Sequence, residues 1–188
     1  MMATQTVPAG VISGRMTARS EEPFVVFLIG MRVNRPFAVR KWIEIFQAFP
    51  TMLRVLSEHP EKGYLHGELF FRFPPLMPVL ISYWRSFDDL ERFARDKNDP
   101  HLEAWRSFNQ KVGGDGTVGI WHETYLIEPG KYENVYANMP AFGLAAATRN
   151  TVQPMNAFQF ARGRLNTAEK DTASEAGYVD SKTFDPYR

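Results

Sequence analysis

The sequence of 188 residues contains no cysteine. Disulfides, thiolate-bound metals and cysteine nucleophiles are therefore excluded, and any metal or cofactor has to be held by histidine, methionine, tyrosine or carboxylate side chains. A chain without cysteine fits a reducing compartment, and we expect a cytoplasmic protein.

An excess of charge of one sign is also missing, because 22 basic residues stand against 21 acidic ones. No lysine or arginine run is interleaved with aromatic residues, so we expect no nucleic-acid partner. No apolar run approaches the roughly 20 residues that cross a bilayer. The first 14 residues also lack a charged segment followed by an apolar one, and we expect neither a signal peptide nor a membrane partner.

What the chain does have is the composition of a globular protein, with 44% hydrophobic and 14% aromatic residues. Residues 1–22 are small and polar and are broken by proline and glycine, which predicts an arm without packed structure. Residues 23–147 form the predicted domain. Residues 148–188 are polar and show no sustained periodicity, which predicts an extended C-terminal tail.

The spacing of apolar residues predicts an α+β domain. The expected elements are a strand at 24–33, a helix at 37–58, strands at 64–73 and 77–84, a second helix from Ser86 to residue 112 that is broken in two near 97–100, and a strand at 118–127. Pro50 predicts a kink or a break in the first helix, and residues 132–140 predict a short edge strand. The order β-α-β-β-α-β is that of the ferredoxin-like fold, an antiparallel sheet with its helices on one face.

The last of these strands holds a histidine and a carboxylate in a segment that otherwise has the pattern of a buried strand. Strand alternation directs His122 and Glu123 to opposite faces of the sheet. Burying such a group without a hydrogen bond costs about 1–3 kcal/mol, so each needs a partner or a role. A structural histidine bonded to a backbone carbonyl is the alternative for His122.

A second histidine lies on an apolar helical stripe, since His101, Trp105 and Phe108 fall on one face of the second helix. If the helices cover the sheet face that carries His122, the two imidazoles converge in an aromatic pocket. Such a pocket suits haem, with one imidazole as axial ligand, or acid–base work on an organic substrate. The alternative for His101 is a first-turn residue bonded to Asp99 or to backbone.

The remaining candidates carry weaker signals. His59 lies in a polar turn and is expected on the surface. His66 alternates with Glu68 along a strand, so it either points into a pocket or is exposed at a strand edge. Glu123 is kept as a candidate acid–base residue, although Glu123 and Tyr125 are better suited to a dimer contact with Arg32 or Arg85.

Five segments carry a resemblance to known proteins: residues 13–18, 27–35, 83–87, 119–125 and 138–144. In this order they resemble a family of small bacterial and fungal proteins labelled monooxygenase-like, within the dimeric α+β-barrel superfamily, over residues 11–147. The resemblance implies a small-molecule substrate. It also implies a C2 homodimer of ferredoxin-like protomers whose sheets pack face to face and bury Trp121, Glu123 and Tyr125.

The run from Tyr83 to His101 is also similar to spheroidene monooxygenase, a haem-containing relative. That resemblance implies a haem iron bound to His101, with His122 as a distal or substrate-facing group and His66 as a competing ligand. The residues that would form apolar walls around the haem are Trp42, Phe46, Trp105 and Phe108.

We therefore predict a haem-binding, monooxygenase-like oxidoreductase. One alternative is a cofactorless monooxygenase of an electron-rich aromatic substrate, with His122 or His101 as the base. Two others are a lyase resembling haem aldoxime dehydratases and a non-enzymatic ligand-binding dimer module in which both histidines are structural.

Overall fold

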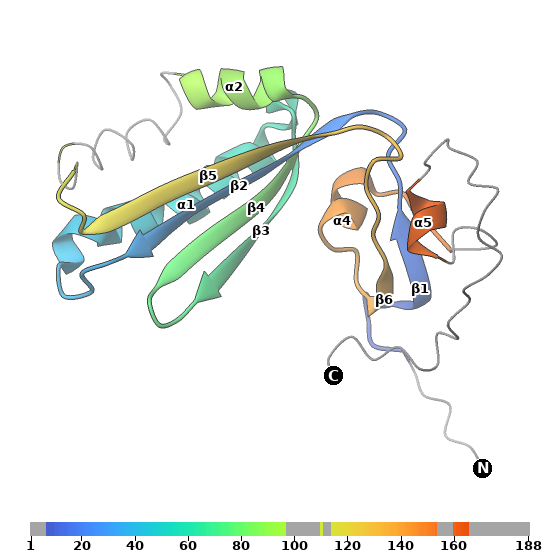
Figure 1. The fold of residues 1–188 in the computed structure, drawn as a ribbon, viewed down its shortest axis with the longest axis horizontal. Helices are drawn as coiled ribbons and strands as arrows, with labels where there is room; N and C mark the ends of the chain where they lie inside the picture. The colour runs from blue at the N-terminus through green and yellow to red at the C-terminus, as the bar shows by residue number, and fades with distance from the viewer. Residues whose placement is uncertain (1–6, 97–109, 111–113, 154–159, 166–188) are drawn as a thin grey trace, which may run out of the picture.

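The computed structural model describes residues 7–96, 110, 114–153 and 160–165 (Figure 1). The strands are β1 (Ile12–Ala18), β2 (Phe24–Val33), β3 (Tyr64–Arg72), β4 (Met77–Trp84), β5 (Val118–Ile127), β6 (Tyr136–Met139) and β7 (Thr151–Val152). The helices are α1 (Val39–Glu58), the 3-10 helix η1 (Pro60–Lys62), α2 (Phe87–Arg95), α4 (Leu144–Thr148) and α5 (Ala161–Arg164).

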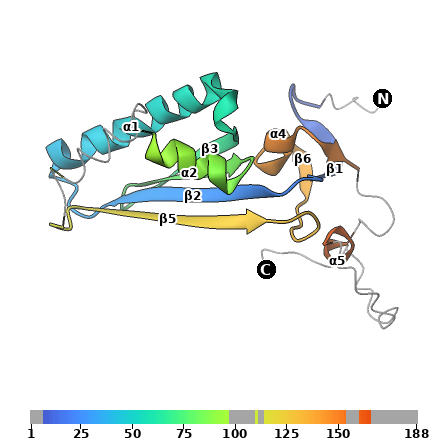
Figure 2. The same cartoon turned by 90° about the horizontal axis from the view of Figure 1, so that it is seen from above.

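The main sheet is antiparallel, with the strand order β3-β4-β2-β5. Helices α1 and α2 lie on one face of it (Figure 2). Together with the chain order β2-α1-β3-β4-α2-β5, this arrangement confirms the predicted ferredoxin-like fold. The second half of the predicted second helix lies outside the described residues. None of the described helices is both long and apolar enough to traverse a bilayer.

Helix α1 runs unbroken from Val39 to Glu58, so Pro50 does not divide it. An internal proline costs a helix about 3 kcal/mol or more. The burial of one apolar face offsets that cost, because Ile45 and Phe49 pack with Met31 of β2 in the main core. Tertiary packing therefore overrides the local signal for a break.

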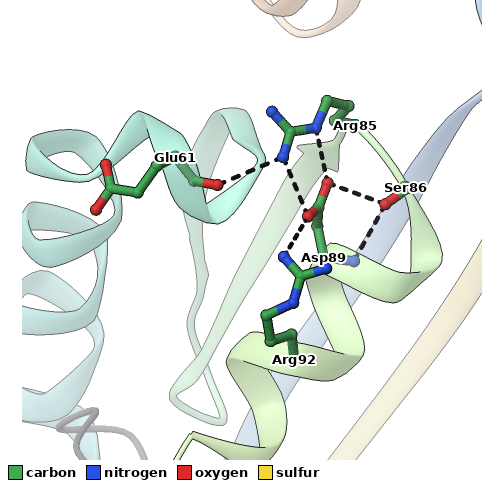
Figure 3. Close-up of polar contacts among 5 residues, drawn as sticks. All are labelled: Glu61, Arg85, Ser86, Asp89 and Arg92. Carbon is green, nitrogen blue, oxygen red and sulfur yellow. Dashed lines mark hydrogen bonds and ion pairs between the residues drawn. The ribbon is translucent and has the colours of Figure 1, made fainter.

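The start of α2 is fixed by the buried carboxylate of Asp89 (Figure 3). It accepts hydrogen bonds from Arg85 Nε at 2.8 Å, Arg92 Nη1 at 2.8 Å and Ser86 Oγ at 2.9 Å. Ser86 is the predicted N-cap, and its Oγ accepts from the Asp89 N–H. Arg85 also donates to the carbonyl oxygen of Glu61, which ties α2 to η1. The hydrogen bond from Arg85, followed by those from Ser86 and Arg92, lowers the pKa of Asp89.

A second, smaller sheet has the order β6-β1-β7 and lies at the other end of the molecule from the start of α1 (Figure 1). Its strand β1 falls within the segment predicted to be an unpacked arm, and that prediction is wrong for residues 12–18. Thr17 and Ala18 are buried, and the Ala18 N–H donates to Asn134 Oδ1 at 2.7 Å. The partner residue is 116 positions away, so no local pattern reveals the pairing.

Part of the predicted C-terminal tail is also structured. Strand β7 pairs with β1, and α5 places Arg164 Nε 2.8 Å from Glu133 Oε2. Helix α4 joins the small sheet to the main one, because Leu144 and Ala145 pack with Ala18 and Phe24. Leu144 and Ala145, which precede the predicted tail, therefore belong to a second core over one end of the main sheet.

Candidate functional site

Strand β5 carries the two polar residues singled out by the sequence, and its pairing with β2 fixes where they point. His122 lies opposite Ile29, and Glu123 lies opposite Leu28. Ile29 packs in the core beneath α1, so His122 belongs to the helix side of the sheet. Glu123 belongs to the other side, the open face. The prediction that the two residues face opposite sides is confirmed.

Within a single protomer, β5 is open to water over the second half of its length. Residues 122–126 are all exposed in the structure. The reason is that β5 is an edge strand, and the core beneath α1 reaches only Val118 and Ile120 at its start. His122 therefore does not need a buried hydrogen-bond partner.

The surroundings of His122 form the helix-side shelf, which consists of Phe27, Ile29, Ile120, His122 and Thr124. The His122 ring lies 5.8 Å from the Phe27 ring, at an angle of 42°. Among the residues that the structure describes, His122 has no hydrogen-bond or ion-pair partner. An imidazole whose nitrogens are not engaged, beside an aromatic ring, is able to take a proton from a bound molecule.

The other predicted members of the site are only partly described. His101, Trp105 and Phe108 lie outside the described residues. Trp42 and Phe46 lie on α1, and their side chains pack against the same core cluster as Ile29 and Ile120 of the shelf. The indole Nε1 of Trp42 donates to the carbonyl oxygen of Pro36 at 3.0 Å.

On the open face, Glu123 has a partner within its own strand. Tyr125 Oη donates to Glu123 Oε2 at 2.6 Å, and this bond raises the pKa of Tyr125. Arg85 was one of two expected dimer partners for this pair, but it is bound to Asp89 near the start of α2. Arg32 lies on the open face, because its neighbours Met31 and Val33 in β2 point to the helix side and pack in the core beneath α1.

The structure places His66 and Glu68 in contact, where the sequence predicted only that they share one face of a strand. His66 Nε2 lies 2.8 Å from Glu68 Oε1, and both side chains are half-buried on β3. His66 pairs with Tyr83 of β4, whose pKa is raised by burial and then by the nearby Tyr136 and Glu68. The spacing of two residues between His66 and Glu68 along a strand is the sequence feature that could have predicted this contact, because such residues point to the same face.

The described histidines do not converge. His66 lies on the open face, because its partner Tyr83 pairs with Val26, which points to the same side of β2 as Leu28. His122 lies on the helix side. His59 is in a turn, 2.8 Å from Glu61, and its side chain is half exposed, which confirms the predicted surface position. Within residues 7–96, 110, 114–153 and 160–165, no group of three or more His, Asp or Glu side chains is placed to hold a metal ion.

A cavity of about 550 Å³ lies away from all three of these histidines, at the small sheet. Thr17 and Ser20 line it from β1 and the segment that follows, and Asn134 and Arg164 line it from the C-terminal part of the chain. Its polar groups are engaged in holding the small sheet together: Asn134 binds the backbone of Ala18, and Arg164 binds Glu133. We therefore assign the cavity no part in the candidate site.

Comparison with known proteins gives one family and several related structures. Residues 24–144 match the family described as Monooxygenase af470-like. Monooxygenase af470 of Aspergillus fumigatus is 32% identical over 153 residues, which cover 72% of this chain and 54% of the relative. This chain thus spans about half the length of that relative.

Two solved structures also align with the chain. One is SnoaB, a cofactor-independent oxygenase from Streptomyces nogalater, which is 16% identical with a TM-score of 0.39, over 54% of this chain and 90% of that one. The other is a putative antibiotic biosynthesis monooxygenase from Caulobacter crescentus, which is 15% identical with a TM-score of 0.41, over 56% of this chain and 90% of that one.

Proposed function

The chain belongs to the Monooxygenase af470-like family, and from this premise we propose that it oxidises a small organic substrate with molecular oxygen and without a resident cofactor. The substrate class is an electron-rich aromatic compound with an acidic C–H group, such as a phenol in its keto form. The observation that carries the proposal is the position of His122, a partner-free imidazole beside Phe27 on the helix-side shelf.

A cofactor-free route needs a base and an apolar place for the substrate, and the shelf supplies both. Phe27, Ile29 and Ile120 offer apolar surface on which a flat substrate ring can lie. Contact between the substrate ring and the Phe27 ring would contribute about 0.5–1.5 kcal/mol. His122 extends from the same face. The base and the substrate ring would therefore lie side by side.

The proposed reaction converts a CH₂ group and O₂ into a carbonyl group and water. His122 takes a proton from the CH₂ carbon, and the resulting carbanion passes electron density to O₂ and forms a C–O bond. The imidazolium returns its proton to the terminal peroxide oxygen. His122 then takes the second C–H proton, the O–O bond breaks as the carbonyl forms, and the departing hydroxide is protonated to water.

A haem on His101 is the competing proposal. A bound haem would supply an iron that activates oxygen, and His101 would hold it while His122 faced the substrate. Trp105 and Phe108 would be its walls, and they lie with His101 outside the described residues. Trp42 and Phe46 lie on α1 and are already packed against the main core cluster, so they would be apolar neighbours of a haem only from that position.

One experiment separates these proposals. We expect protein expressed with a haem precursor to lack a Soret band, and to consume oxygen with an anthrone-type phenolic substrate in the presence of EDTA. The measurements are an absorption spectrum, before and after dithionite and carbon monoxide, and an oxygen-electrode trace. A Soret band that shifts with carbon monoxide would establish haem instead. A colourless protein that consumes no oxygen with such substrates would favour the binding-module alternative.

We also propose that the protein is a homodimer whose open faces pack together. The open face carries half-buried apolar side chains from neighbouring strands, Leu28, Ile81 and Trp121, which one protomer leaves partly in water. Trp121 lies over Gly30, where an added Cβ would be 2.7 Å from the indole Nε1, so its ring follows the sheet surface. A flat apolar surface of this kind suits an isologous contact.

Leu28→Glu is expected to weaken that dimer, because two carboxylates would be brought into an apolar interface. We expect the dissociation constant to rise about 100-fold, measured by light scattering over a dilution series. Leu126→Glu is the matched control, since Leu126 lies on the helix side of the same sheet and is 68% exposed. Equal effects of both substitutions, or no effect of Leu28→Glu, would contradict the open-face interface.

A further inference from the structure

One end of the main sheet carries exposed aromatic rings next to arginines. Phe37 in the loop between β2 and α1 is 98% exposed, and Phe73 at the tip of the β3–β4 hairpin is 82% exposed. Phe71, near the end of β3, is 58% exposed. With the exposed Arg35, Arg40 and Arg72, these three residues define the aromatic–basic patch.

The residues of the patch come from two separate segments of the chain that meet at one end of the main sheet, with Phe71 on the helix side of β3 and Arg72 on its other face. The N–H of Val33, at the end of β2, donates to the carbonyl oxygen of Leu76 in the hairpin at 3.0 Å. Behind the patch, the Phe46 ring of α1 lies 5.9 Å from the Phe71 ring of the hairpin. In Figure 1 the end of β2, the start of α1 and the hairpin tip gather at the end of the molecule away from the small sheet.

The charges of the patch have one sign. Residues 32–43 contain four basic residues and no acidic one, and residues 72–77 contain one basic residue and no acidic one. Lys41 is neutralised by its ion pair with Asp115. Arg35, Arg40 and Arg72 have no ion-pair partner among the described residues.

The position of these cations is not explained by helix stability. The first turn of α1 contains no acidic residue, and Arg40 and Lys41 stand there instead. The positive end of a helix dipole favours acidic side chains and disfavours basic ones. Lys41 is held there by Asp115, but Arg40 has no ion-pair partner among the described residues and sits where the helix gains nothing from it, which suggests that it serves a contact outside the chain.

We propose that the aromatic–basic patch attaches this protein to the surface of an anionic phospholipid membrane. Exposed phenylalanines enter the boundary between headgroups and acyl chains, while the arginines contact the lipid phosphates. Such attachment needs no membrane-spanning helix. A second copy of the patch is a poor partner, because its uniform positive charge would face itself across a two-fold axis.

The test is flotation of the full-length protein with lipid vesicles. We expect it to float with vesicles that contain roughly one third phosphatidylserine and to bind about tenfold less to pure phosphatidylcholine. The double substitution Arg35→Glu with Arg40→Glu should weaken binding by about 30-fold or more. Phe37→Ser with Phe73→Ser should weaken it by about tenfold or more at every salt concentration.

Matched controls come from residues elsewhere on the surface. Phe87→Ser removes a ring that is 45% exposed on α2, and Arg54→Glu with Arg95→Glu reverses two exposed charges on the helices. These variants should float like the wild type. The proposal is overturned if the wild type stays in solution with both vesicle types, or if the controls lose binding as much as the patch variants. It is also overturned if the wild type binds no vesicles and the variant Phe37→Ser with Phe73→Ser has a smaller oligomer mass than the wild type. The patch would then contact a second copy.

Discussion

His122→Ala is expected to lower kcat/KM for oxygen consumption by about 10²–10⁴-fold, the usual contribution of a general base. Without the imidazole, the described shelf retains the apolar contacts of Phe27 and Ile29 but has no other group that can accept a proton from carbon. The loss should fall mainly on kcat, because the surfaces that bind the substrate remain. The melting temperature should change little, since His122 is exposed and makes no hydrogen bond within the described part of the chain.

His66→Gln is the matched control for this prediction. It also removes an imidazole from the main sheet, but from the open face, and glutamine keeps a hydrogen-bonding group near Glu68. Activity should stay within about threefold of the wild type. If His66→Gln abolishes oxygen consumption while His122→Ala leaves it intact, the base has to be reassigned to the His66–Glu68 pair. That pair has the geometry of an imidazole oriented by a carboxylate.

Asp89→Ala is expected to reduce the free energy of unfolding by about 3 kcal/mol. The side chain of Asp89 is only 5% exposed, and its removal breaks hydrogen bonds from Arg85, Arg92 and Ser86 at once. The start of α2 then loses its link to η1 through Arg85 and Glu61. Urea unfolding followed by circular dichroism measures the change.

Arg92→Ala provides the comparison, because it removes a single donor whose side chain is 68% exposed. We expect it to cost less than about 1 kcal/mol, as for other exposed ion pairs. If the two substitutions have the same small effect, Asp89 is not the organising group of this cluster.

The contribution of Asp89 should also depend on pH. Hydrogen bonding, first from Arg85, places the pKa of Asp89 in the folded protein below its ordinary value. The stabilisation is therefore present above the unfolded pKa of about 3.9, and it is lost as the pH falls from there through the folded pKa. The difference in urea midpoint between the wild type and Asp89→Ala should be constant near neutral pH and shrink below about pH 4.

The sequence predicted the features that depend on neighbours along the chain. Apolar spacing located α1 and the strands of the main sheet, and Ser86 marked the start of α2 because a side-chain cap needs only the next three residues. Strand alternation placed His122 and Glu123 on opposite faces, since the period of two is a property of the strand itself.

Tertiary structure decided what depends on partners far along the chain. The pairing of β1 with β6, the exposed edge position of β5 and the continuity of α1 through Pro50 all follow from packing that no local pattern encodes. The same holds for the aromatic–basic patch, whose two segments meet only because Val33 and Leu76 pair at the end of the sheet. The sequence alone thus specified the residues and their local periodicity. Only the long-range contacts determined which faces are buried, which remain in water, and which side chains share a surface.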